Sequence, residues 1–308
     1  MRERVSMHLP DSVRGMRLDQ VLASELQLSR SLVAKLIKQK DVQVNGKNPR
    51  KSAEAFPGDQ VEVLLPDASP ISIETPAQLP ILYEDADIVV VNKPVGMAAH
   101  AAAAWSGPTV IGALLAGGHQ VSTSGPQERA GIVHRLDVGT SGAMVVAKSE
   151  LAYRQLQEDF RARRVKKIYH TLVQGYPDPT QGTINAPIGR HPSRDFKMAV
   201  VEGGRAAITH YRTLEVLPGA SLLEIQLETG RTHQIRVHMQ AIGHGVVGDP
   251  IYGPNPQLAK KLGLTRQWLH AASLSFAHPR TGKQVSFEAP LTPDLETALK
   301  RLRTGDSK

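Results

Sequence analysis

The chain has 308 residues, a formal net charge of +8 and a sequence pI near 9.7, and it contains no cysteine. The lack of cysteine excludes disulfides, cysteine-ligated zinc, Fe–S clusters and a thiol nucleophile. The excess of basic residues favours a polyanionic partner such as nucleic acid. The alternative, a basic protein without such a partner, carries equal weight on charge alone.

The N-terminal ten residues carry charges but no apolar segment, which argues against a signal peptide. No run of the sequence approaches the roughly 18–20 apolar residues that a membrane-spanning helix needs. We therefore predict a cytoplasmic protein with no membrane partner, long enough for two domains.

Residues 14–74 are predicted to form a small first domain, preceded by an N-terminal tail at 1–13. Apolar residues recur at helical spacing over 18–22 and 32–37, which predicts two short helices. A short β ribbon follows, because alternating or β-branched residues flank a tight-turn dipeptide. Its predicted strands and turn are 41–44, Asn45-Gly46 and 61–65.

Cations are frequent on the second of these helices and on the ribbon that follows it. We single out four as candidate nucleic-acid contacts: Arg30, Lys35, Lys38 and Lys47. The competing interpretation is a solvated helix face, which is the commoner meaning of such a run.

A linker is predicted at 75–80, in a proline-rich stretch, and a second domain at 81–305. Strands outnumber helices in this domain without strict alternation, so we expect an α+β fold with a mixed or largely antiparallel sheet. The expected strands are 87–91, 143–147, 168–173, 208–217 and 222–227. The expected helices are a segment capped by Ser149 that ends in a cationic run, then 233–241 and 293–303.

Asp137 is a candidate catalytic carboxylate in the stretch HRLDVGTSG (134–142), which lies between two apolar runs. Polar residues on loops held by strands are often functional. An Asp that satisfies turn amides is the commoner explanation for such a residue, and the adjacent His134 and Arg135 do not decide between the two. Spacing alone leaves the role of Asp137 open.

The segment RTHQIRVHM (231–239) is dense in hydrogen-bond donors and follows a strand-to-helix junction. Arg231, His233 and Arg236 there would form an anion site at a helix start. The two histidines are five residues apart rather than four, so a zinc site is not expected. The alternative is an exposed basic helix.

Tyr169 opens the strand that follows the cationic run. It is a candidate for stacking on a base, against the commoner role of a tyrosine in core packing. Neither a P-loop nor a dinucleotide-binding glycine motif nor a nucleophile elbow occurs, so no nucleotide cofactor is expected.

Residues 14–66 resemble the S4 RNA-binding domain, through RLDQVLASELQLSRSLVAKLIKQKDVQVNGK (17–47). Five further blocks resemble the RluA-type pseudouridine synthases in their order, and are most similar to the branch of large-subunit ribosomal RNA pseudouridine synthase D. These blocks are DIVVVNKPVGMAAH (87–100), GIVHRLDVGTSGAMVVAK (131–148), KKIYHTLVQG (166–175), LETGRTHQIRVHM (227–239) and WLHAASLSFAHPRTGK (268–283).

The resemblance implies an enzyme that isomerises uridine to pseudouridine in RNA, with ribosomal RNA or a pre-ribosomal particle as its partner. It implies no metal and no cofactor, and we expect a monomer. It identifies Asp137 as the catalytic residue, Tyr169 as the aromatic partner of the uracil and Arg236 as the partner of the carboxylate. His134 and Arg135 would contact RNA beside the flipped base.

Val138-Gly139 replaces a charged pair that this family often has after the aspartate. A stretch at 253–267 matches a subset of the family, and we expect Lys260, Lys261 and Arg266 to reach RNA from it. One alternative is a non-catalytic RNA-binding or ribosome-assembly factor with the same fold. Another is a glycosidase, although that chemistry normally needs two carboxylates.

Overall fold

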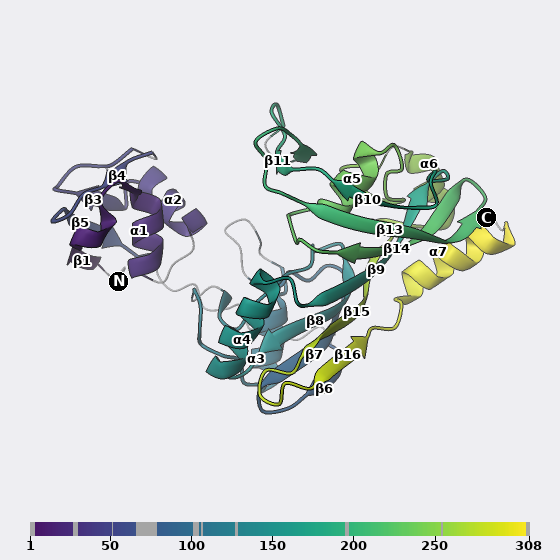
Figure 1. The fold of residues 1–308 in the computed structure, drawn as a ribbon, viewed down its shortest axis with the longest axis horizontal. Coiled ribbons are helices and arrows are strands. Elements are labelled where there is room, and N and C mark those ends of the chain that lie inside the picture. The colour runs from purple at the N-terminus through teal and green to yellow at the C-terminus, as the bar shows by residue number, and fades with distance from the viewer. Residues whose placement is uncertain are drawn as a thin grey trace.

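The structure is a computed structural model that describes residues 4–26, 30–50, 52–65, 79–100, 105, 107–126, 129–194, 197–253 and 255–305. The side chains at positions 12, 30–32 and 35 lie outside this description, as does most of the predicted linker at 75–80. No helix of the described part is long and apolar enough to cross a membrane. Figure 1 shows the arrangement of the elements.

The N-terminal domain contains two helices and a three-stranded antiparallel sheet in the order β1-β5-β3, with a small β2-β4 pair beside it (Figure 1). Its elements are β1 (Arg4–His8), a 3-10 turn (Asp11–Val13), β2 (Met16–Arg17), α1 (Leu18–Glu25), α2 (Arg30–Lys38), β3 (Val42–Val44), β4 (Glu54–Ala55) and β5 (Gln60–Leu64). The predicted helix faces are confirmed, because Leu18, Val21, Leu22, Val33, Leu36 and Ile37 share one apolar core.

The predicted N-terminal tail is wrong for the residues that the structure describes. Arg4–His8 form β1, which pairs along its whole length with β5. Leu9 and Val13 are 3% and 4% exposed in the core of this domain. Alternate residues of β1 bury too little apolar surface to give a clear strand pattern in the sequence. The strand conformation of this segment therefore depends on pairing with β5.

The second domain is built on one mixed sheet of nine strands, in the order β10-β13-β14-β9-β15-β8-β7-β6, with β16 also paired to β15. All pairs are antiparallel except β15 with β8. The strands are β6 (Ile81–Glu84), β7 (Ile88–Lys93), β8 (Ser141–Ala147), β9 (Lys166–Gln174), β10 (Gln181–Asn185), β13 (Ile208–Leu217), β14 (Ala220–Leu227), β15 (Leu269–Ala277) and β16 (Gln284–Glu288). This confirms the predicted α+β class with a mixed sheet.

Helices cover the sheet, and a separate strand pair completes the domain (Figure 1). These elements are α3 (Val110–Ala116), α4 (Glu150–Arg161), β11 (Ile188–Arg190), β12 (Met198–Val200), α5 (Gln234–Ala241), α6 (Pro256–Leu262) and α7 (Pro293–Thr304). The predicted cap of α4 is confirmed, because the Ser149 hydroxyl accepts a 3.1 Å hydrogen bond from Ala152 N–H.

Alternation along the central strands divides the core between the two faces of the sheet. Val89 and Val91 of β7 pack with α3, α5 and Tyr169. Ile88 and Val90 pack instead with α4. The predicted cationic run after α4 is split, because Lys166 and Lys167 already belong to β9. Tyr169 therefore lies on the same side of the sheet as α5, which positions the site.

We predict that Leu9→Ala destabilises the N-terminal domain by about 2–5 kcal/mol, the usual cost of such a truncation in a core. Both tryptophans, Trp105 and Trp268, lie in the second domain. The urea midpoint by far-UV circular dichroism should therefore fall while the midpoint by tryptophan fluorescence stays. His8→Ala, at an exposed position of β1, is the control; an equal effect of both variants would contradict the assignment of this segment to the core.

Candidate active site

Asp137 lies on the loop that leads into β8, and the backbone of this loop is held at two points. Thr140 N–H donates to the carbonyl of Asp137 at 3.0 Å, which closes a turn. Gly96 N–H donates to the carbonyl of Val138 at 2.9 Å. The carboxylate itself is 19% exposed and borders a cavity, so the loop presents it to a ligand.

Arg266 holds the same loop from behind. Its guanidinium donates to the carbonyl of Gly139 at 3.1 Å and forms two hydrogen bonds, of 2.7 and 3.0 Å, with Asp294. Gly139 allows a close approach here, since an added Cβ would lie 2.5 Å from the side-chain amide of Gln267, which would have to move. The expectation that Arg266 contacts RNA is wrong, because its side chain is 6% exposed and already paired. Lys260 and Lys261 are exposed on α6.

Arg236, from α5, joins Asp137 to a second carboxylate that the sequence reasoning missed. It donates to Asp137 at 3.1 Å and to both oxygens of Asp249, at 2.6 and 2.9 Å. Asp249 also accepts hydrogen bonds from the amides of Ile251 and Tyr252. Arg236 and Asp249 are both buried, so this is a desolvated chain of charges in which two anions share one guanidinium.

Opposing effects act on the protonation of this pair. Burial is the largest effect on Asp249 and alone would raise its pKa, but the hydrogen bonds and charge of Arg236, together with the hydrogen bonds from the amides of Tyr252 and Ile251, lower the pKa. Burial alone would lower the pKa of Arg236, and the two carboxylates reverse that effect and raise it. Both groups are therefore charged at neutral pH, and the guanidinium is fixed in direction toward Asp137.

His233 caps α5 with a left-handed backbone, at φ 58°, which is uncommon for a non-glycine residue. Its Nε2 lies 4.0 Å from Asp137 and its Nδ1 lies 3.0 Å from the hydroxyl of Tyr252. That hydroxyl also accepts from Met198 N–H at 2.8 Å, and its own proton is free to bond to Nδ1. We take the tautomer of His233 to be the one with the proton on Nε2, which places an N–H on the side of the carboxylate.

Tyr169 and Lys93 complete the surroundings of Asp137. Burial, and then the charge of Asp137, raise the pKa of Tyr169 above its ordinary value. Lys93 is fully buried and donates to the carbonyls of Pro94 and Met97, both at 2.8 Å. Burial lowers the pKa of Lys93 to about 7, against the attraction of Asp137. The sequence offers one indication that Lys93 is buried: it stands at the end of a strand whose preceding residues are mostly apolar.

The cavity beside Asp137 has a volume of about 100 Å³. Its lining is Arg135, Leu136, Asp137, Thr140, Tyr169, Leu227, Gly230, Arg231, Thr232, His233, Gln234, Ile235, Arg236 and Leu269. The structure therefore brings together the three predicted catalytic positions, which come from a loop, β9 and α5. Arg135, Arg231 and His233 also lie at this cavity, as expected for residues near a bound nucleotide.

The remaining predicted RNA contacts lie elsewhere. The ring of His134 stacks on Phe160 at 4.6 Å between centroids, and its Nε2 accepts from Val145 N–H at 3.0 Å. Burial lowers the pKa of His134 to about 3, so the ring is neutral at physiological pH. Its hydrogen bond to Val145 holds the loop against β8. Lys38 and Lys47 are exposed on the N-terminal domain, whereas the side chains of Arg30 and Lys35 lie outside the described part.

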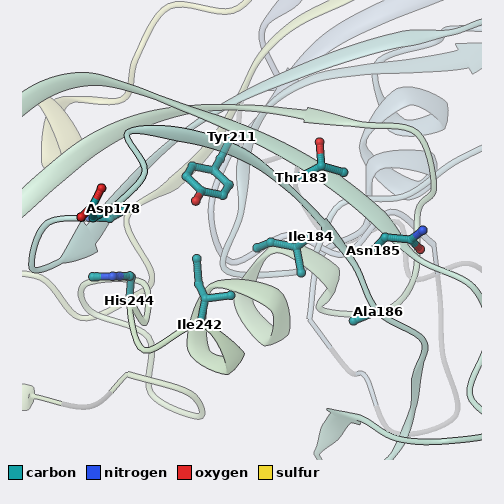
Figure 2. A pocket seen from close by; sticks show the side chains of 9 residues that line it. Asp178, Thr183, Ile184, Asn185, Ala186, Tyr211, Ile242 and His244 are labelled. Carbon is teal, nitrogen blue, oxygen red and sulfur yellow. The ribbon is translucent and has the colours of Figure 1, made fainter.

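A second cavity, of about 360 Å³, contains none of the predicted site residues (Figure 2). Its lining is Pro177, Asp178, Thr183, Ile184, Asn185, Ala186, Tyr211, Ile242 and His244. It lies along the edge strand β10 and behind the C-terminal end of α5. Its lining has no interacting charged pair of the kind that surrounds Asp137 among the described residues, so we place the chemistry at the smaller cavity.

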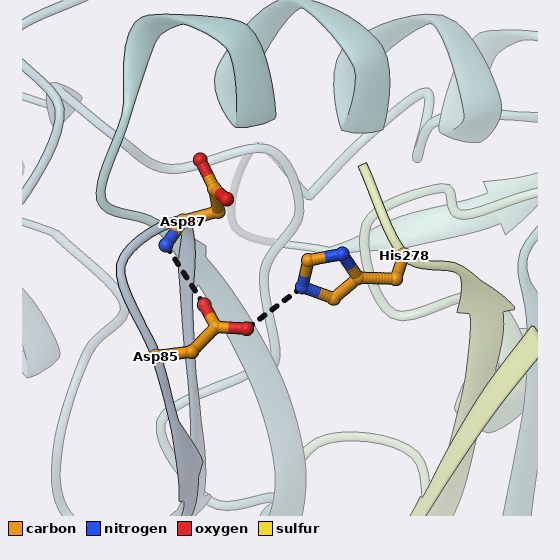
Figure 3. A group of neighbouring side chains, drawn as sticks. All are labelled: Asp85, Asp87 and His278. Carbon is orange, nitrogen blue, oxygen red and sulfur yellow. Dashed lines mark hydrogen bonds and ion pairs between the residues drawn. The ribbon is translucent and has the colours of Figure 1, made fainter. Parts of the chain in front are cut away.

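Asp85, Asp87 and His278 form a cluster with the spacing of metal ligands (Figure 3). Asp85 accepts from His278 at 2.8 Å, and Asp87 accepts two hydrogen bonds, of 2.5 and 2.7 Å, from Arg280. The guanidinium thus already neutralises Asp87. These contacts tie the β6–β7 turn to the β15–β16 turn, which accounts for the cluster structurally.

Comparison with known proteins identifies the family. A family profile described as RNA pseudouridylate synthase matches residues 87–241, and an S4 domain profile matches residues 16–51. The chain belongs to the RNA pseudouridine synthase family. This synthase is 53% identical, over 97% of its length and 98% of the relative's, to an uncharacterised RNA pseudouridine synthase of Mycobacterium bovis.

Two further comparisons agree. The synthase is 43% identical to the ribosomal large subunit pseudouridine synthase D of Neisseria meningitidis, over 97% of this chain and 82% of that one. The solved structure of human RNA pseudouridylate synthase domain containing 4 matches with a TM-score of 0.57 and 27% identity, over 73% of this chain and 93% of that one. The protein is thus an RNA-modifying enzyme that converts uridine to pseudouridine.

We predict that Asp249→Asn lowers the free energy of unfolding of the second domain by about 3–5 kcal/mol at pH 7, because it leaves a buried guanidinium short of a charged partner. Urea unfolding followed by tryptophan fluorescence measures this, with the exposed Glu202→Gln as control. The pKa of Asp249 is lower folded than unfolded, so the difference from wild type should be complete above about pH 4 and shrink as the pH falls through the folded pKa. A difference that stayed constant down to about pH 2 would contradict this role.

Proposed function

We propose that this synthase isomerises specific uridines of large-subunit ribosomal RNA, with Asp137 as the catalytic carboxylate. The observation that carries the proposal is the carboxylate of Asp137, which is the only acidic side chain among the described residues that line the cavity, is held by Arg236 and shares this cavity with Tyr169. The ribosomal target rests on the names of relatives such as the synthases D of Neisseria meningitidis and Nitrosomonas europaea, which are 43% and 40% identical to this chain. We propose a cytoplasmic enzyme that acts as a monomer.

The reaction must break the C1′–N1 bond, turn the uracil and join C5 to C1′. In one route an oxygen of Asp137 forms a bond to C1′ while N1 leaves with the bonding electron pair. In the other route Asp137 removes the C2′ proton and a glycal forms as N1 leaves. In the first route the bond between Asp137 and C1′ breaks as C5 bonds to C1′. In the second route C5 bonds to C1′ of the glycal and Asp137 returns the proton to C2′. In both, the C5 proton is then lost and N1 ends protonated, so the product is an isomer of the substrate.

The neighbours of Asp137 support either route. Arg236 donates from Nη1 to one oxygen of the carboxylate and so orients it, since its other two nitrogens, Nε and Nη2, are fixed on Asp249. His233 directs an N–H toward the same carboxylate without forming a full hydrogen bond at 4.0 Å. These donors stabilise negative charge on Asp137 before and after it reacts, which is electrostatic preorganisation of the nucleophile or base.

Tyr169 would form the floor on which the detached uracil rests. The ring is buried beside the cavity and stays a neutral phenol, because burial and the charge of Asp137 raise its pKa. Once Asp137 has bonded to the sugar or taken a proton, that charge no longer acts on the phenol. The hydroxyl can then assist removal of the C5 proton, and the ring keeps the base from leaving.

The target uridine must leave its stack to reach this cavity, at a cost of a few kcal/mol. We propose that the S4 domain supplies part of the compensating RNA affinity through exposed cations such as Lys38 and Lys47. Arg135 is exposed at the rim of the cavity and would contact the RNA beside the flipped nucleotide.

Asp137→Asn should abolish pseudouridine formation while keeping the hydrogen bond to Arg236. Pseudouridine mapping of large-subunit ribosomal RNA from cells that lack the gene, complemented with wild type or variant, measures this. Asp178→Asn, at an exposed site away from the cavity lining, should restore every position that wild type restores. Full restoration by Asp137→Asn would favour a non-catalytic RNA-binding factor instead.

Tyr169→Phe is expected to keep RNA affinity and to slow turnover, because the ring face remains and the hydroxyl is lost. Tyr169→Ala should weaken both, since no aromatic face is left for the uracil; stacking on an aromatic residue contributes about 1–3 kcal/mol per base. Single-turnover rates and filter binding with the same RNA separate the two effects. Equal turnover of Tyr169→Phe and wild type would leave the hydroxyl without a chemical role.

A further inference from the structure

Lys167 is a buried lysine two residues before Tyr169 on β9. Side chains two apart on a strand point to the same face of the sheet, so Lys167 and Tyr169 lie on one face while Lys166 lies on the other. Lys167 is 9% exposed, whereas Lys166 is exposed. The side chain of Lys167 therefore lies on the face of the sheet that carries the site.

The surroundings of Lys167 are cationic. Its ammonium has no hydrogen bond and no acidic partner among the residues that the structure describes. Burial, and then the charges of Arg163 and Arg231, lower the pKa of Lys167 to about 8. Arg231 in turn has its own pKa lowered by burial and by Arg205 and Arg163. The cationic group therefore consists of four residues: Arg163, Lys167, Arg205 and Arg231.

One carboxylate reaches this cationic group, and it is shared. Glu228 lies 3.4 Å from Arg163, and its other oxygen is 2.8 Å from His210. Arg231 is anchored by its Nε on the carbonyl of Ala206, at 2.9 Å. A buried ammonium among like charges is unfavourable unless an anion joins it, so the group is organised for an anionic ligand.

Arg231 connects the cationic group to the site, because it lines the same cavity as Asp137 and Tyr169. We propose that Arg163, Lys167, Arg205 and Arg231 bind a backbone phosphodiester of the substrate RNA next to the target nucleotide. The ligand class follows from the position, since a nucleotide cannot enter the cavity without bringing its flanking phosphates. Guanidinium groups suit phosphate oxygens, and such contacts fix the register of the nucleic acid. This inference rests on the proposed function.

The test is Lys167→Met, with Lys166→Met as the matched control on the opposite face of the same strand. The probe is ribosomal RNA from cells that lack the gene. Loss of a hydrogen bond to a charged group should raise KM roughly tenfold to a hundredfold. The salt slope, which is the slope of the logarithm of the RNA-binding constant against the logarithm of the salt concentration, is measured by filter binding. Its magnitude should fall by about one. Lys166→Met should change neither quantity.

Lys167→Arg keeps the charge and should retain most of the affinity for RNA. If the aliphatic chain of Lys167 had a purely structural role, there would be no reason for the charge to preserve the affinity. If Lys167→Met does not fold, as judged by tryptophan fluorescence, Arg231→Gln decides by the same two measurements. A folded variant with the KM and salt slope of wild type overturns the phosphate site. If wild type forms no pseudouridine, the proposed function fails, and the salt slopes of RNA binding still decide for or against the phosphate site.

Discussion

The bidentate pair between Arg236 and Asp249 is the interaction on which the site depends. A guanidinium that is 4% exposed cannot remain charged in that place without a desolvated anion beside it, and Asp249 is that anion. Because Asp249 binds two of the three guanidinium nitrogens, the third, Nη1, has a fixed position, and it donates to Asp137. The orientation of the carboxylate is thus determined by a second acid that has no access to the ligand.

The turn that carries Asp249 has a wider effect. Asp249 accepts from the amides of Ile251 and Tyr252, so the turn is held by the same side chain that holds Arg236. Tyr252 then orients His233, and its ring lies 5.1 Å from the guanidinium of Arg236. One short turn therefore positions both Arg236 and His233, the two donors that face Asp137. Arg266 in turn holds the loop that carries Asp137, through its hydrogen bond to the carbonyl of Gly139.

The cavity combines one carboxylate with an excess of cations around it. Arg236 donates to Asp137, Lys93 lies near enough for the charge of Asp137 to raise its pKa against burial, and the cationic group at Lys167 lies along the same face of the sheet. Such a field attracts an RNA backbone and tolerates negative charge that moves between the carboxylate and the uracil. The proposed phosphate contact and the proposed chemistry would thus use the same electrostatic arrangement at two neighbouring positions.

Much of the architecture could be predicted from the sequence, because it rests on local patterns. Ser149 with its apolar spacing determined α4, and the alternation in 208–217 determined β13 to the residue. The family resemblance likewise selected Asp137, Tyr169 and Arg236. Patterns of this kind lie within short stretches of sequence, so they can be recognised without the structure.

The partners of these residues were decided by the tertiary structure alone. Arg266 was expected to reach RNA from the 253–267 stretch, but its guanidinium pairs with Asp294, 28 residues further along. Arg4–His8 form a strand only because β5 offers an edge, and Asp249 becomes a partner of the site only once its turn meets α5. The sequence by itself determined the strongly patterned elements and selected the candidate catalytic residues; long-range packing decided which charges are buried together, because burial depends on neighbours that no local pattern contains.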